Sequence, residues 1–176
     1  MIQTFDTQLE VSLRALQDVV APALSGAENH VLEQFNLALA TLSFLRQRLP
    51  YARGYHRLEL QHFMDCSAAV RNLIAADQPE LATQMKTTES LGSQELVRPE
   101  AEIEDYLLVA RKLRELINDS VKMANGKPYE AELDAFVCRQ QQAFLPAQRA
   151  WCAPLGLDTE ADKLPSIDDV LSRSGN

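Results

Sequence analysis

Three ionisable side chains near the middle of the chain have the types and spacing that acid–base or metal chemistry requires. His56, Glu59 and His62 follow one another at intervals of three residues, so in a helix they lie on adjacent turns. At about 100° per residue, Glu59 projects near the middle of an apolar stripe, with one histidine toward each side. A carboxylate there must be paired, hydrogen-bonded, protonated or metal-bound, because a lone buried charge is prohibitively costly.

Two interpretations of this polar set need no metal, and both stay open. In the first the set is structural: Glu59 pairs with Arg114 or Arg46, and the polar layer fixes the register of the helices. In the second, the set lines a pocket for a small organic or phosphorylated ligand between facing helices. The polar lining is then supplied by Glu59, His62, Arg46 and Arg114. The walls are supplied by Tyr55, Tyr106 or Trp151.

The third interpretation is a metal site that uses His56, Glu59 and His62. Glu59-x-x-His62 has the spacing that lets a carboxylate and an imidazole reach one ion, and it resembles half of the di-iron signature of ferritin-like bundles. A second Glu-x-x-His pair is absent, because the other histidines are His30 and His56. A similar comparison is with DinB-like bundles, whose metal is held by three histidines.

The elements that must position these residues are helices. Apolar residues recur at spacings of three and four, and caps or prolines punctuate the pattern. This predicts helices over residues 5–24, 26–49, 51–76, 79–86, 99–124 and 128–152, with a restart after Pro146 and a loop over residues 87–97. The second helix carries one apolar face, made of Val31, Phe35, Ala38, Leu42, Leu45 and Leu49.

The predicted fold class is therefore all-α, an up-and-down antiparallel helical bundle of four to five long helices plus short ones. Residues 1–153 form the bundle domain. Residues 154–176 form a C-terminal tail with a short helix signalled by Ser166 and Asp169.

Charge and composition exclude several classes of protein. The net charge of −8 over 176 residues argues against a nucleic-acid binder, which needs a basic surface. The least charged helical stretch, residues 34–45, is too short to cross a bilayer. The first ten residues, MIQTFDTQLE, lack the basic start and apolar run that are typical of a secretory signal, and the three cysteines form no Cys-x-x-Cys pair. A cytoplasmic protein without a membrane segment is expected.

Arginines gather around the turn between the second and third helices, at positions 46, 48, 53 and 57. Arg46 and Arg48 offset the negative end of the helix dipole. Alternatively the arginines bind a small anionic ligand, or the acidic tail that includes Asp158 lies across them.

Motifs indicate neither an enzyme class nor a specific cofactor. Glycine-rich phosphate loops and the nucleophile elbow are absent from the sequence. A second apolar surface, made of Leu37, Phe44, Leu60 and Met64, is expected to be covered by the helix at residues 79–86 or by another copy of the chain. We therefore expect a non-catalytic assembly or partner-binding module, forming a homodimer. The alternative is a small-ligand- or metal-binding protein, possibly an enzyme, centred on Glu59 and His62.

Overall fold

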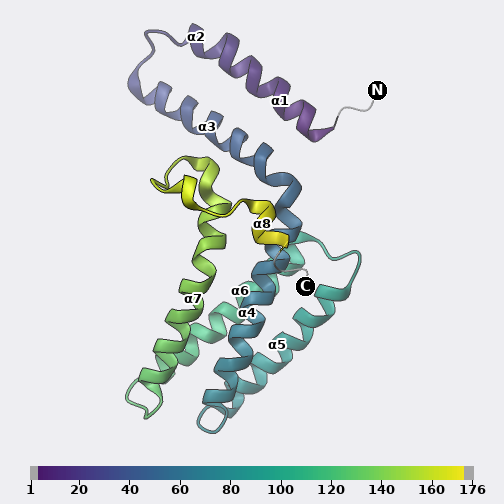
Figure 1. Cartoon of the computed structure of the whole chain (residues 1–176), viewed down its shortest axis with the longest axis vertical. Coiled ribbons are helices and arrows are strands. Elements are labelled where there is room, and N and C mark those ends of the chain that lie inside the picture. Colours follow the sequence, from purple (N-terminus) through teal and green to yellow (C-terminus); the bar gives the residue numbers. More distant parts are fainter. Residues whose placement is uncertain (1–3, 173–176) are drawn as a thin grey trace. The chain divides into compact units, whose positions relative to one another are not determined.

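The computed structural model describes residues 4–172, and over this range the chain is helices and loops without a strand (Figure 1). The predicted all-α class is confirmed. The chain divides into two compact units. The hairpin unit consists of Met1–Tyr51 with Arg149–Leu164, and the bundle unit consists of Ala52–Gln148 with Pro165–Asn176. The domain boundary drawn from the sequence at residue 153 stays a prediction.

The hairpin unit contains two antiparallel helical segments (Figure 1). The first joins α1 (Phe5–Ala15), a π-helical segment (Leu16–Val20) and α2 (Ala21–Ala23). It begins at Thr4, whose side chain accepts a hydrogen bond from Thr7 N. A loop with Gly26 in the left-handed region, at φ 93°, reverses the chain, and α3 (Asn29–Arg48) runs back along α1.

The second part of the hairpin unit is Arg149–Leu164. It contains the last turn of α7 (Glu130–Cys152) and two 3₁₀ turns, Ala153–Leu155 and Ala161–Lys163. Arg48 joins it to α3 by donating to the carbonyl oxygens of Ala150 at 2.9 Å and Trp151 at 2.7 Å. Phe44 meets Trp151 edge-on, with ring centroids 6.1 Å apart.

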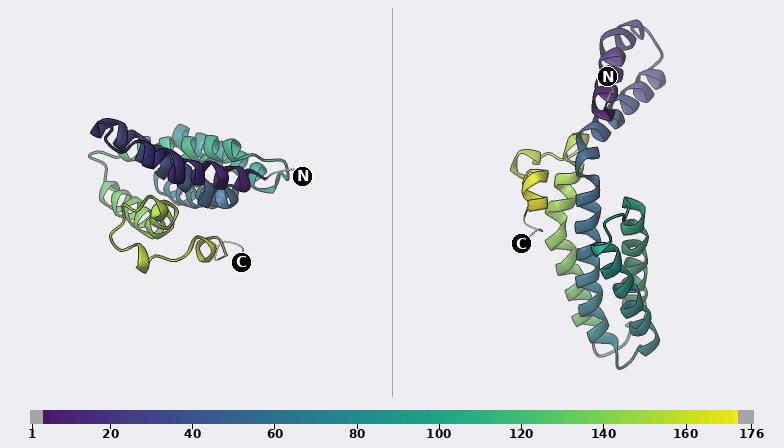
Figure 2. Two further views of the ribbon diagram at one scale, coloured as in Figure 1. Left: turned by 90° about the horizontal axis from the view of Figure 1, so that it is seen from above. Right: turned by 90° about the vertical axis from the view of Figure 1, so that its right-hand side faces the viewer.

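The bundle unit contains α4 (Ala52–Ile74), α5 (Pro79–Val97), α6 (Ile103–Met123), α7 up to residue 148, and the short α8 (Ile167–Ser172). The long helices run side by side in alternating directions (Figure 2). Their fully buried side chains include Leu60, Val70, Ile74, Met85, Leu113 and Leu133. A close-packed apolar core of this kind is the main source of stability for the unit.

The predicted loop over residues 87–97 is wrong, because α5 continues through it as one helix. Its hydroxyl groups bond to carbonyl oxygens four residues earlier, as Thr87 does to Thr83 and Ser93 does to Glu89. They are thereby satisfied within the helix. At Gly92 the neighbouring helices come close: a Cβ there would lie 2.7 Å from Met64 Sδ. Glycine at this position serves packing and not a turn.

The ends of two other helices also differ from the sequence prediction. Helix α6 begins at Ile103 and not at Pro99, because the Glu102 side chain and Asp105 form a capping box around its first turn. Helix α7 passes through Pro146 without the predicted restart.

The predicted short helix of the tail is confirmed. Ser166 caps α8 by accepting from Asp169 N at 3.1 Å, while Ser166 Oγ donates to Asp169 Oδ2 at 2.7 Å. Ile167 and Val170 are buried. A Cβ on Gly54 would lie 3.3 Å from Leu171 Cδ1, so α8 packs closely on α4.

The expected second apolar surface is not one surface. Leu60 and Met64 lie in the bundle unit, where Leu60 is fully buried and Met64 meets Gly92 of α5. Phe44 packs on Trp151 in the hairpin unit, whereas Leu37 is 61% exposed. Within residues 4–172, no helix combines the length and apolar composition of a membrane span.

Candidate functional site

Helix α4 carries four of the residues that the sequence marked as a site. His56 and Glu59 form a pair, with His56 Nδ1 3.0 Å from Glu59 Oε2 and both side chains less than one-fifth exposed. Tyr55 is buried and touches the His56 ring, with centroids 5.4 Å apart. His62 lies on the next turn against Phe144 of α7. The structure therefore brings these α4 residues into one small polar and aromatic layer.

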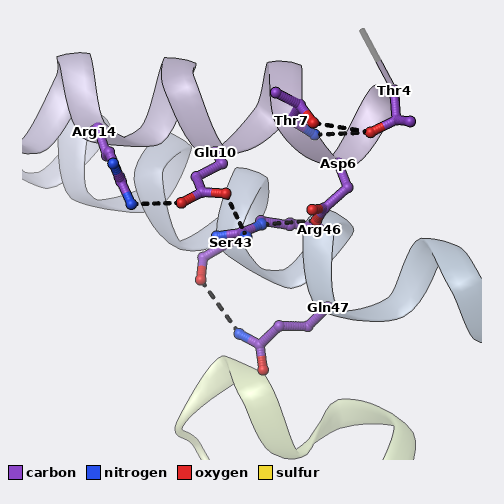
Figure 3. A network of polar contacts seen from close by, with 8 residues as sticks. All are labelled: Thr4, Asp6, Thr7, Glu10, Arg14, Ser43, Arg46 and Gln47. Atoms are coloured by element: carbon purple, nitrogen blue, oxygen red, sulfur yellow. Dashed lines mark hydrogen bonds and ion pairs between the residues drawn. The ribbon is translucent and has the colours of Figure 1, made fainter.

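The predicted pairing of Glu59 with Arg46 or Arg114 is wrong. Arg46 belongs to the hairpin unit, where its Nε donates to Asp6 Oδ1 at 2.9 Å and its Nη2 to Glu10 Oε2 at 3.1 Å (Figure 3). The Arg114 guanidinium lies over the ring of Phe63, 5.7 Å from its centroid. Glu59 instead takes its partner from the preceding turn of its own helix.

His62 is packed as an aromatic ring. It stacks on Phe144 with centroids 4.3 Å apart and an interplanar angle of 10°. Burial lowers the pKa of His62, against the opposing effect of Asp65 and Glu59. Its Nε2 is buried and has no hydrogen-bond partner. We therefore assign the proton of the neutral ring to Nδ1, because an unpaired acceptor at Nε2 avoids burying an unpaired N–H donor.

The side chains around His56, Glu59 and His62 form neither a metal centre nor a site with a reactive thiol. In the described part of the chain, no three His, Cys, Asp or Glu side chains are grouped so that they could hold a metal ion. Burial raises the pKa of the Cys66 thiol to about 11. The thiol is therefore protonated at neutral pH and a poor nucleophile.

The arginine cluster is divided between the two units, and each member has a local role. Arg48 donates to carbonyl oxygens at the end of α7, as described above. Arg53 donates to the Pro99 carbonyl oxygen at 2.8 Å, and Arg57 to that of Leu96 at 2.9 Å. Arg53 and Arg57 thereby satisfy backbone carbonyl oxygens at and just after the C-terminal end of α5. Asp158, a member of the acidic tail expected to cross the cluster, binds Arg149 instead.

The hairpin unit has two unlike flanks. One is polar and contains Asp6, Glu10, Arg14, Ser43, Arg46 and Gln47 (Figure 3). At about 100° per residue, the opposite side of α1 and α3 carries Phe5, Ser12, Val31, Ala38, Leu45 and Leu49. We call these six residues the apolar flank.

The apolar flank is uncharged and open. Phe5 is 79% exposed, Leu49 49% and Leu45 45%. A hollow of about 250 Å³ lies beside them, lined by Phe5, Gln8, Leu9, Ser12 and Leu49. Exposed side chains of this size on adjacent helices are typical of an interaction surface.

Sequence reasoning placed part of this surface in the core. Val31, Ala38 and Leu45 were expected on the same buried face as Phe35 and Leu42. The structure leaves the first three exposed and the last two half-buried. The available signal was the absence of any charged residue from positions 34–45. A solvated helix normally carries charges on its outer face.

Comparison with known proteins adds no further assignment. No protein family, curated protein or solved structure matches the chain.

Proposed function

We propose that the chain is a non-catalytic module that binds a protein partner through the apolar flank of its hairpin unit. The observation that carries this proposal is the exposure of large apolar side chains, Phe5, Leu45 and Leu49 among them, on a flank whose members carry no charge. The His56–Glu59 pair and the His62–Phe144 stack are then structural elements of the bundle unit.

The hairpin alone buries little apolar surface. Leu13 is the one hydrophobic side chain of α1 and α3 that reaches core burial. Most helical stability in proteins comes from packing of an apolar face and not from helix propensity. A partner that covers the apolar flank would bury the apolar side chains that α1 and α3 leave exposed.

Charge supports a protein partner over a membrane or a nucleic acid. The apolar flank has no Lys or Arg, and the chain has a net charge of −8. Anionic lipid surfaces and phosphate backbones both attract basic residues. The proposal locates the protein in the cytoplasm, where the free cysteines stay reduced.

Thiol protection inside expressing cells tests this proposal without knowledge of the partner. The exposed Cys138 and Cys152 are first replaced by Ser, and the buried Cys66 is left in place. Ala38→Cys then reports on the apolar flank. Asn36→Cys reports on an exposed position of the same helix that projects toward the polar flank. A membrane-permeant maleimide should label Cys at 36 several-fold faster than at 38. Equal labelling at both positions would contradict the proposal.

A second candidate function is binding of a small ligand beside Glu59 and His62. The buried, partnerless Nε2 of His62 is the observation that favours it. Native mass spectrometry of protein purified without chelator tests it. A bound mass that disappears on denaturation and in Glu59→Gln supports this candidate. If the native mass equals that of the unliganded chain, the small-ligand function is overturned for every ligand that binds tightly enough to stay bound through purification.

A further inference from the structure

We infer that the partner on the apolar flank is a second copy of this chain, seated antiparallel so that two hairpins form a four-helix bundle. This inference rests on the proposed function and names the occupant of the same surface. Charge distribution, residue spacing and area each support it.

The two ends of the hairpin unit differ in charge. Between residues 15 and 45, which include the loop end, there are three acidic residues and no Lys or Arg. The other end, counted with Arg149–Leu164, is balanced, with five basic and five acidic residues. The basic residues are Arg14, Arg46, Arg48, Arg149 and Lys163, and the acidic ones are Asp6, Glu10, Asp158, Glu160 and Asp162. An antiparallel second copy sets each acidic end beside a neutral end, whereas a parallel copy would set acid against acid.

The spacing along α3 matches this arrangement. Val31, Ala38 and Leu45 recur every seven residues, which keeps them on one face of the helix. With Ala38 on the two-fold axis, Val31 of each copy lies opposite Leu45 of the other. The small side chain of Ala38 permits close approach of the helices at the centre. The hollow beside Phe5 and Leu49 then receives an apolar side chain from the loop end of the second copy.

The area is sufficient for a specific dimer. A helix of the length of α3, 20 residues, is about 30 Å long. Two packed helices present a flank roughly 20 Å wide. Each copy therefore contributes on the order of 600 Å², and the pair about 1,200 Å², which is the lower end of the range for stable interfaces. Pairing adds no like-charge contact within the flank, because its members are uncharged.

Sedimentation of the purified full chain tests whether the partner is a second copy. Wild type should sediment as a dimer at micromolar concentration. Ala38→Glu should weaken self-association at least tenfold, because it places two like charges at the axis. Ala38 is exposed, so the change removes no core packing, and Asn36→Glu adds the same charge on the same helix as the control. A monomeric wild type would overturn the inference.

Cross-linking with a short bis-maleimide tests the direction of pairing. In the background without Cys138 and Cys152, Ala38→Cys should cross-link to itself. A mixture of Val31→Cys and Leu45→Cys chains should give the mixed product in preference to either self-product. Preferred self-products at 31 and 45 would overturn the antiparallel arrangement.

The outcomes separate this inference from the proposed function. A purified monomer whose residue 38 is protected in cells contradicts the second copy but supports a different protein partner. A chain whose residue 38 is freely labelled in cells contradicts both.

Discussion

The imidazole of His62 lies flat on the ring of Phe144, with centroids 4.3 Å apart. This stack joins α4 to α7 within the bundle unit. Tyr55 contacts the same phenyl ring, with centroids 6.4 Å apart. A single side chain of α7 therefore packs against two turns of α4, and the protonation of His62 is coupled to this packing.

Stability of the bundle unit should fall as pH falls below the ordinary histidine range. The pKa of His62 is lowered by burial in the folded chain, so the unfolded chain binds the proton more readily. The stabilisation is complete above the unfolded pKa of about 6.5 and is lost as the pH falls through the lower folded value. Urea unfolding at a series of pH values measures this slope. His62→Phe keeps an aromatic ring without a titrating group, and its slope should be shallower.

NMR titration of the His62 ring provides an independent measurement. In Phe144→Ala, water reaches the imidazole, and the pKa of His62 should rise toward its ordinary value. An unchanged pKa in this variant would show that Phe144 does not cause the desolvation.

Gly92 should respond to the size of the side chain that replaces it. A Cβ there meets Met64 Sδ at 2.7 Å and Val109 Cγ1 at 3.4 Å. Gly92→Ala gains about 1 kcal/mol in helix propensity, and the Met64 side chain can move away, so we expect a change in unfolding free energy within about 1 kcal/mol. Gly92→Val should destabilise by about 1–3 kcal/mol, as overpacking does.

A double-mutant cycle identifies the contact responsible. Met64→Ala should reduce the cost of Gly92→Val, because it opens the space that the valine needs. Additive effects in chemical denaturation would place the clash elsewhere, against Val109.

The sequence predicted the helices where apolar spacing is regular, and it failed where tertiary contacts override local preference. Ser90, Gly92 and Ser93 have the composition of a loop, yet they lie in α5. Their hydroxyl groups donate to backbone carbonyl oxygens of the same helix, as Ser90 Oγ does to Lys86 O at 2.9 Å, and Gly92 allows the close approach of Met64. That approach joins residues of different helices, so composition within a window cannot reveal it.

The candidate site was predictable in part. Helical projection placed Glu59 on an inward side of α4, and its side chain is 17% exposed. The predicted partner of Glu59 was wrong because helical projection identifies the face of the helix on which a residue lies. It does not identify the helices that pack against that face. Arg46 is a clear case, since its ion pairs with Asp6 and Glu10 lie in the hairpin unit. The His56–Glu59 pair depends on which rotamers the two side chains adopt on α4, and the sequence alone does not specify these rotamers.

The Arg149–Asp158 pair should contribute to stability down to strongly acidic pH. Arg149 donates to both carboxylate oxygens, at 2.7 and 2.9 Å, and Glu160 N adds a third bond. These bonds lower the pKa of Asp158 to about 2. The stabilisation is present above the unfolded pKa and is lost as pH falls through about 2. Carboxyl NMR titration should show the low pKa in wild type.

Arg149→Lys keeps the charge but cannot form the two parallel bonds, so it should raise the pKa of Asp158. Arg139→Lys is the matched control, because Arg139 is an exposed arginine of the same helix. An Asp158 pKa that stays near 2 in Arg149→Lys would contradict the role given to the paired bonds.

Trp151 is the single tryptophan of the chain, and it reports on how α3 holds the last turn of α7. Arg48 donates to the carbonyl oxygens of Ala150 and Trp151 and lies over the indole, 5.8 Å from the ring centroid. Burial lowers the pKa of Arg48, but an arginine stays charged at neutral pH. Arg48→Ala therefore removes two charge-assisted bonds and one face of the indole environment. The tryptophan emission should shift to longer wavelength, and acrylamide should quench it more strongly.

Arg48→Met separates packing from hydrogen bonding, because it keeps an apolar stem against the indole and loses both donors. We expect it to protect Trp151 from acrylamide better than Arg48→Ala does, while both variants lower the unfolding free energy by about 1.5–3 kcal/mol, the range for bonds to a charged group. Gln47→Ala, at the exposed neighbouring position, controls for a general change in α3. Wild-type emission in Arg48→Ala would mean that Phe44, at the edge of the indole, holds the segment without the arginine.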